Sequence, residues 1–231
     1  MIIWLITALY AICAVLTIAI EYKNSPNNDT QGKYTIMKCI TSALFLVIAV
    51  AAFAIAGNWT FFLLLPAYVL CFFGDLFLAL GHEIDNRLKN PQFVIGVFSF
   101  CAAQVVLCFV FLSMMDWHVS WPAIVALLVL GGTIFFTKSD DYDFGSNALP
   151  CSIYAFFVGL SAGLGLQLII TLPHDGFAVL LGVGAIVFLL SDLVLTMKLF
   201  WKKDVPWAGA VLLVLYWGAM WLYTAAPAMC I

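Results

Sequence analysis

The sequence predicts an all-α integral membrane protein, a bundle of about eight transmembrane helices with both termini outside the cytoplasm. Hydrophobic residues make up 65% of the 231 residues and charged residues only 9%, whereas a soluble domain carries about 25% charged residues. The chain divides into apolar stretches of about 20 residues, the length that crosses a bilayer. The basic residues fall on one side of the membrane that these stretches define.

Short connections join the stretches that are predicted to span the membrane. The fifth stretch is short and contains Gly131-Gly132, so it fits a span least well. No connection is long and polar enough to fold alone, so residues 1–231 are expected to form a single polytopic membrane domain. The predicted spans cover roughly residues 2–20, 35–56, 59–81, 92–114, 120–137, 148–172, 176–197 and 206–226.

The distribution of basic residues predicts the orientation of the bundle. All 9 lysines and arginines lie in or beside the first, third, fifth and seventh connections. Because cytoplasmic loops carry an excess of Lys and Arg, these connections are predicted to be cytoplasmic and both termini external. Short loops and external termini suit a bacterial inner membrane. The basic residues are Lys23, Lys33, Lys38, Arg87, Lys89, Lys138, Lys198, Lys202 and Lys203.

Two aspartates inside predicted spans are the main candidates for function. Asp75 follows Gly74 in the third span, and Asp192 follows Ser191 in the seventh. At ~1.5 Å per residue, both lie on the order of 10 Å inside the cytoplasmic boundary. Carboxyl groups in lipid usually face the interior of a bundle and mark a function. We expect the two to lie within about one water of contact and to share a proton, so that one acts as acid and one as base. The alternative is a hydrogen-bonded role in helix packing.

Other polar residues in the spans are candidates for substrate binding, as is Ser191. Tyr154 and Asn147 lie near the level of the acids on the sixth span, and Tyr154 can donate to a carboxylate or to a substrate oxygen. Gln104 in the fourth span and Tyr216 in the eighth need polar partners in lipid.

The histidines do not predict a metal site. His82 lies at the cytoplasmic end of the third span, whereas His118 and His174 lie outside, so the three cannot meet on one ion. There is no His-Glu-x-x-His motif and no cysteine pair of the kind that zinc enzymes use. No metal and no cofactor is therefore expected. His82 follows Asp75 by two helical turns and is a candidate for the rim of the site; the preferred alternative is a solvated helix end.

Five motifs lie in the chain after the first two predicted spans. They are Gly74-Asp75-Leu-Phe-Leu, Phe93-x-x-Gly96-x-x-x-Phe100-x-x-Ala103, Tyr154, Gly184-Ala185-x-x-Phe188-x-x-Ser191-Asp192-x-x-Leu195 and Tyr216-x-x-Ala219. In these motifs the chain resembles the YhhN-like membrane protein family, which includes the lysoplasmalogenases.

The chain departs from the family pattern at three polar positions. Gln104 and Leu107 stand where the family commonly has His and Tyr, and Met220 stands where it commonly has Gln. These changes remove polar groups near the expected site and leave Asp75 and Asp192 intact.

The resemblance implies hydrolysis of the vinyl-ether bond of a lysoplasmalogen, a lysophospholipid, to a fatty aldehyde and a glycerophospho-ethanolamine or -choline. A protonated aspartate would act as general acid on the vinyl ether, and its ionised partner would stabilise the cation. Which of the two is the acid stays open at the sequence level. No metal or organic cofactor is required.

Two other functions are compatible with the same residues. Paired acids in a membrane also serve as proton relays, which suits a proton-coupled small-molecule transporter. A lipid-binding or scaffolding protein without catalysis is the third hypothesis. With a net charge of -3 and no basic surface, a nucleic acid is not an expected partner, and the lipid bilayer is. The sequence predicts no oligomeric state.

Overall fold

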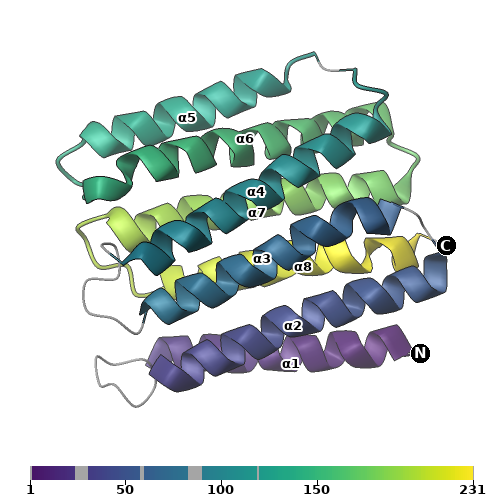
Figure 1. Ribbon diagram of the computed structural model, residues 1–231, viewed down its shortest axis with the longest axis horizontal. Coiled ribbons are helices and arrows are strands. Elements are labelled where there is room, and N and C mark those ends of the chain that lie inside the picture. Colours follow the sequence, from purple (N-terminus) through teal and green to yellow (C-terminus); the bar gives the residue numbers. More distant parts are fainter. Residues whose placement is uncertain (1, 24–30, 58–59, 83–89, 119, 231) are drawn as a thin grey trace.

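The computed structural model describes residues 2–23, 31–57, 60–82, 90–118 and 120–230. Within these ranges eight α-helices run in alternating directions (Figure 1), and no β-strand is found in them. A 3₁₀ turn at Gly145–Asn147 precedes the sixth α-helix. The α-helices are α1 (Ile2–Lys23), α2 (Gln31–Ala56), α3 (Thr60–His82), α4 (Pro91–Met114), α5 (Pro122–Lys138), α6 (Ala148–Thr171), α7 (Gly176–Phe200) and α8 (Ala208–Met229).

The helices have the length and composition of membrane spans. Seven of them are long and apolar enough to cross a bilayer, and α5, with 17 residues, is a shorter apolar helix. Large apolar side chains such as Leu5, Leu128 and Phe135 are exposed on outer faces of the bundle, where lipid rather than water solvates them. The chain is an integral membrane protein, and the prediction of about eight helices with a short fifth one is confirmed.

The helices form two layers with the core between them. α2, α3 and α4 pack side by side in one layer, and α1, α8, α7, α6 and α5 follow one another in the second. In Figure 1, α8 and α7 lie behind α3 and α4. α2 contacts α1 and α8, and α4 contacts α6, so the layers join at both edges. Large side chains such as Phe45, Phe111 and Phe188 are fully buried between the layers.

Side-chain caps fix where two of the central helices begin. The Asn90 side chain accepts a hydrogen bond of 3.0 Å from the N–H of Gln92 at the start of α4. The Asp175 side chain accepts one of the same length from the N–H of Phe177 at the start of α7. Such caps satisfy amide groups that have no partner within the helix and stabilise it by about 1 kcal/mol. They set the register of α4 and α7, which both line the site described below.

The described basic residues gather at one end of the bundle, where α1, α3, α5 and α7 end, and we call it the basic end. α1 begins and α8 ends at the opposite end (Figure 1). Arg87, Lys89 and the side chain of Lys23 lie outside the described residues. The basic end contains Lys33, Lys38, Lys138, Lys198, Lys202 and Lys203.

Candidate functional site

A cavity of about 100 Å³ lies between the two layers, toward the basic end, and we call it the acid cavity. Both aspartates singled out in the sequence line it, although they come from different layers. Most of its wall is aliphatic or aromatic. Its polar and ionisable lining consists of Lys38, Asp75, Thr133, Cys151, Tyr154, Ser191, Asp192, Thr196 and Tyr216.

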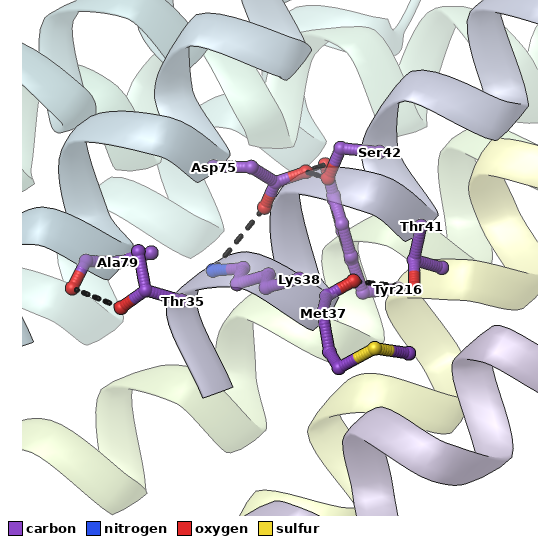
Figure 2. A network of polar contacts seen from close by, with 8 residues as sticks. All are labelled: Thr35, Met37, Lys38, Thr41, Ser42, Asp75, Ala79 and Tyr216. Atoms are coloured by element: carbon purple, nitrogen blue, oxygen red, sulfur yellow. Dashed lines mark hydrogen bonds and ion pairs between the residues drawn. The ribbon is translucent and has the colours of Figure 1, made fainter. Parts of the chain in front are cut away.

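Asp75 is buried and has three polar partners, which Figure 2 shows. The Lys38 ammonium lies 3.2 Å from Oδ1 of Asp75. The hydroxyl of Ser42 donates to Oδ2 at 2.7 Å, and the hydroxyl of Tyr216 donates to the same oxygen at 2.6 Å. Lys38 and Ser42 are four residues apart on α2, so one helix face carries both. The carboxyl group is therefore held by α2 and α8 as well as by its own helix.

Gly74 lets an aromatic ring lie directly against α3 beside Asp75. A Cβ atom at this position would come within 2.5 Å of the Phe100 ring of α4. The Phe100 ring packs edge-on against Phe188 of α7, with centroids 6.3 Å apart, and against Tyr216, with centroids 6.0 Å apart. The glycine of the Gly-Asp pair thus has a packing role, because it places Phe100 in the wall of the acid cavity.

Asp192 is half-buried and has different partners. The hydroxyl of Tyr154 on α6 donates to its Oδ2 at 2.6 Å. No basic side chain in the described ranges forms an ion pair with Asp192. The neighbouring Ser191 is buried in the cavity wall, where its hydroxyl donates to the backbone carbonyl of Phe188 at 2.9 Å. The two acids therefore differ in charge environment: Asp75 faces a cation, whereas Asp192 faces a neutral hydroxyl.

No hydrogen bond joins the two carboxyl groups in the described part of the chain. Each is bound by its own tyrosine, Tyr216 for Asp75 and Tyr154 for Asp192. They belong to one site because they line the same cavity. The expected separation of about one water stays a prediction.

The remaining candidates lie at different places. Ser191 lines the acid cavity, whereas Asn147 and Gln104 are buried but do not line it. Asn147 ends the 3₁₀ turn before α6. Neither amide atom of Gln104 has a hydrogen-bond partner within the described residues, although we expected a polar partner for it. His82 is the last residue of α3, and its side chain lies outside the described residues.

Sequence reasoning missed the site role of Lys38 and Ser42. It treated Lys38 only as a topology marker, although this residue lies within the predicted span 35–56. A lysine inside a span is costly and usually faces a partner, and an acid in the neighbouring helix was available in Asp75. The ion pair of Lys198 with Glu21, which joins α7 to α1, was also missed. The sequence signal for this pair was similar, because Glu21 and Lys198 are ionisable residues of opposite charge at the ends of two predicted spans.

The fold and the site define a polytopic membrane protein with an acidic cavity in its core. The chain belongs to the YhhN family, because the model of that family matches residues 33–226. The match begins within α2, so it includes Lys38 and Ser42 as well as both acids. Comparisons with curated proteins and with solved structures found no match.

Proposed function

We propose that this protein is an intramembrane hydrolase that cleaves the vinyl-ether bond of lysoplasmalogens. The products are a fatty aldehyde and a glycerophospho-ethanolamine or -choline. One observation carries the proposal: Asp75 and Asp192 line one largely apolar cavity and have different partners. The family resemblance suggests the substrate class, and the cavity offers a site for acid catalysis away from bulk water.

The different partners support different roles for the two acids. In this proposal Asp75 is a carboxylate, because Lys38 and two hydroxyl donors balance its charge. Asp192 holds a proton and acts as general acid, since its partner Tyr154 is neutral and an unpaired charge in a largely apolar cavity is unfavourable. The hydroxyl of Tyr154 donates to one carboxyl oxygen, which leaves the other oxygen to carry the proton.

The reaction then follows from these roles. Asp192 gives its proton to the β-carbon of the vinyl ether, where a C–H bond forms and an oxocarbenium ion results. The carboxylate of Asp75 stabilises this cation. Water adds to the cationic carbon and returns a proton to Asp192, which yields a hemiacetal. The hemiacetal loses the glycerol oxygen, which takes up the hydroxyl proton, and the aldehyde forms. One water is consumed, and both acids return to their starting states.

The wall of the acid cavity suits the alkenyl chain of this substrate. Phe93, Val97, Phe100, Phe188 and Leu199 contribute apolar surface to it. Small-molecule sites in proteins are mostly apolar, with a few polar groups that fix orientation. Here the two acids and their tyrosines are among the few polar groups, so the lining suits a vinyl ether flanked by apolar carbon.

Aldehyde release from a 1-alkenyl lysophosphatidylethanolamine by the purified protein in nanodiscs tests the proposal. Asp75→Asn and Asp192→Asn are each expected to lower the rate at least about 100-fold, the usual effect of losing an acid–base group. Asp116→Asn is the matched control, because Asp116 is exposed and lies at the opposite end of the bundle. Full activity in either site variant contradicts the mechanism.

A proton-coupled transporter is a second candidate, favoured by the buried ion pair of Lys38 and Asp75. Such pairs can exchange a proton when a substrate or an ion approaches. A pH-sensitive dye inside proteoliposomes distinguishes the two functions. Proton movement that needs Asp75, without aldehyde release, supports transport; aldehyde release in the absence of any proton gradient supports the hydrolase.

We further propose that the basic end faces the cytoplasm, as the positive-inside rule suggests, and that the membrane is a bacterial inner membrane. Reporter fusions to the C-terminus test this orientation. When fused to the C-terminus, a reporter that is active only outside the cytoplasm is expected to be active. Activity of a reporter that works only in the cytoplasm contradicts the proposal.

A further inference from the structure

We infer that a hollow at the basic end binds the phosphate of the substrate headgroup and that it connects to the acid cavity. The inference deepens the proposed function and rests on it. This outer hollow, of about 670 Å³, is formed by residues of α1, α7, the α7–α8 connection and the first turn of α8. Its charged residues are Glu21, Lys198, Lys202, Lys203 and Asp204.

A third, smaller space of about 60 Å³ lies between the outer hollow and the acid cavity, and we call it the neck. The neck shares Lys198 with the outer hollow. It shares Lys38 with the acid cavity, together with apolar side chains that include Phe93 and Leu199. The three spaces therefore adjoin one another between the two aspartates and the surface of the basic end. In this proposal the substrate occupies them as one continuous path.

The side chains along this path suit an anion at its outer end. Lys202 and Lys203 are exposed. Lys202 donates to the backbone carbonyl of Asp140, and the ammonium of Lys203 lies 5.4 Å from the centre of the Trp201 ring. Neither of these contacts neutralises a lysine, so both charges remain available for a phosphate. Lys198 is ion-paired with Glu21, which leaves Asp204 as the remaining carboxylate of the hollow.

Gly209 makes room for the ion pair at the inner edge of the outer hollow. A Cβ atom at this position would lie 2.9 Å from the ammonium nitrogen of Lys198 and 3.0 Å from Oε1 of Glu21. The α8 backbone therefore packs closely on the pair, which holds Lys198 at the junction between the hollow and the neck. In this proposal Lys198 marks the inner edge of the phosphate site, whereas Lys202 and Lys203 supply the charge for a ligand whose vinyl ether lies in the acid cavity.

The dimensions of a lysoplasmalogen agree with this path. Asp192 and Lys198 are six residues apart on α7, which corresponds to about 9 Å along the helix axis. Six bonds separate the vinyl-ether carbon from the phosphorus atom, and with bond lengths near 1.5 Å the extended span is about 7 Å. A substrate with its vinyl ether at Asp192 therefore brings its phosphate to the level of Lys198 along α7, in the hollow that Lys202 and Lys203 also line.

Binding of a non-hydrolysable ligand tests the inference without any turnover. The probe is radiolabelled 1-O-alkyl lysophosphatidylethanolamine, which has a saturated ether, bound to the full-length protein in nanodiscs; 1-O-alkylglycerol is the phosphate-free reference. The double variant K202Q/K203Q is expected to bind the phospholipid at least about tenfold more weakly, since the loss of even one charge-assisted hydrogen bond has about this effect. Its binding of the alkylglycerol is expected to match wild type, which also shows that the variant folds. Lys203→Gln alone, which keeps the Lys202 contact to the α5–α6 connection, is expected to give a smaller loss in the same direction.

The control is K33Q/K138Q, which removes two lysines from the same end of the bundle outside the three spaces. Equal weakening in this control shows only a general attraction of the basic end for phospholipid and overturns the inference. Equal affinity of wild type for the two probes also overturns it. Inorganic phosphate is added as a competitor: displacement at submillimolar concentration indicates a site for free phosphate and overturns the lipid assignment, whereas no displacement supports it. Because the probe is not cleaved, failure to release aldehyde from a vinyl-ether substrate contradicts the proposed function and leaves this binding result unchanged.

Discussion

Replacing Lys38 by methionine removes the cation that faces Asp75 while it keeps most of the apolar volume of the side chain. At the observed separation of 3.2 Å and an effective dielectric constant of about 20, the Coulomb attraction of the pair is about 5 kcal/mol. Removal of one partner of a buried pair typically destabilises a protein by about 3–5 kcal/mol. At about 3 °C per kcal/mol for a chain of this length, the thermal midpoint is expected to fall by about 10 °C.

A double-mutant cycle separates this pairing from other effects of the substitution. Asp75→Asn leaves Lys38 buried without its anion, so it too is expected to destabilise the fold. The double variant has no buried charge at either position. Its loss in free energy of unfolding is expected to be at least about 3 kcal/mol smaller than the sum of the losses in the two single variants. The buried thiols of Cys71, Cys101 and Cys108 make a thiol-reactive dye a suitable unfolding probe.

The control for this cycle is Lys138→Met, since Lys138 lies at the same end of the bundle but lines none of the three spaces and forms no ion pair in the described ranges. In both the wild-type and the Asp75→Asn protein, Lys138→Met is expected to change the thermal midpoint by less than Lys38→Met does in the wild type. Exposed ion pairs typically show coupling energies of about 0.5 kcal/mol. A coupling energy between Lys38 and Asp75 below this value would refute the argument that a buried charge pair holds Asp75 as a carboxylate.

Three further predictions concern single side chains. Tyr154→Phe removes the 2.6 Å hydrogen bond to Asp192 and is expected to lower the rate of aldehyde release about tenfold with little change in thermal midpoint; an unchanged rate contradicts a role for this hydroxyl. Gly74→Ala pushes a methyl group against the Phe100 ring, so both activity and thermal midpoint are expected to fall, by roughly 1–3 kcal/mol in stability; Gly131→Ala, which meets open space, is the matched control. Gln104→Leu removes a buried amide that has no partner among the described residues and is expected to raise the free energy of unfolding by about 1–2 kcal/mol, measured by the same dye assay; a loss of stability shows that a polar group binds this amide.

Hydropathy was sufficient to predict the helices, because a span in lipid must be both long and apolar. The differences lie at the ends. α2 begins at Gln31 rather than 35, and α7 continues to Phe200 rather than 197. A helix can extend beyond the hydrocarbon region, where its polar residues meet water and headgroups, and hydropathy then no longer marks its end. The short α5 was expected from the length of its apolar stretch.

The site could be predicted only in part, because hydropathy does not tell which side of an apolar helix faces its neighbours. The depth of Asp75 and Asp192 along their helices was readable from residue counts, and the common cavity agrees with it. The rotation of α2 was not readable. Lys38 lies near the end of a helix, where a lysine usually extends toward water, and only the packing of α2 on α3 turns it toward Asp75.

Lys38 connects the two halves of the proposed substrate path, because it lines both the acid cavity and the neck. A carboxylate without a counterion at Asp75 would repel a phosphate in the outer hollow, whereas the ion pair presents no net charge along the neck. The same cation would then serve catalysis, by keeping Asp75 ionised, and substrate entry, by cancelling its charge toward the headgroup. Lys38→Met is therefore expected to raise KM for a phosphate-bearing substrate more than for an alkenylglycerol, while kcat falls for both. A fall in kcat with an equal change in KM for the two substrates would contradict the role of Lys38 in substrate entry. Lys38 would then act only by keeping Asp75 ionised.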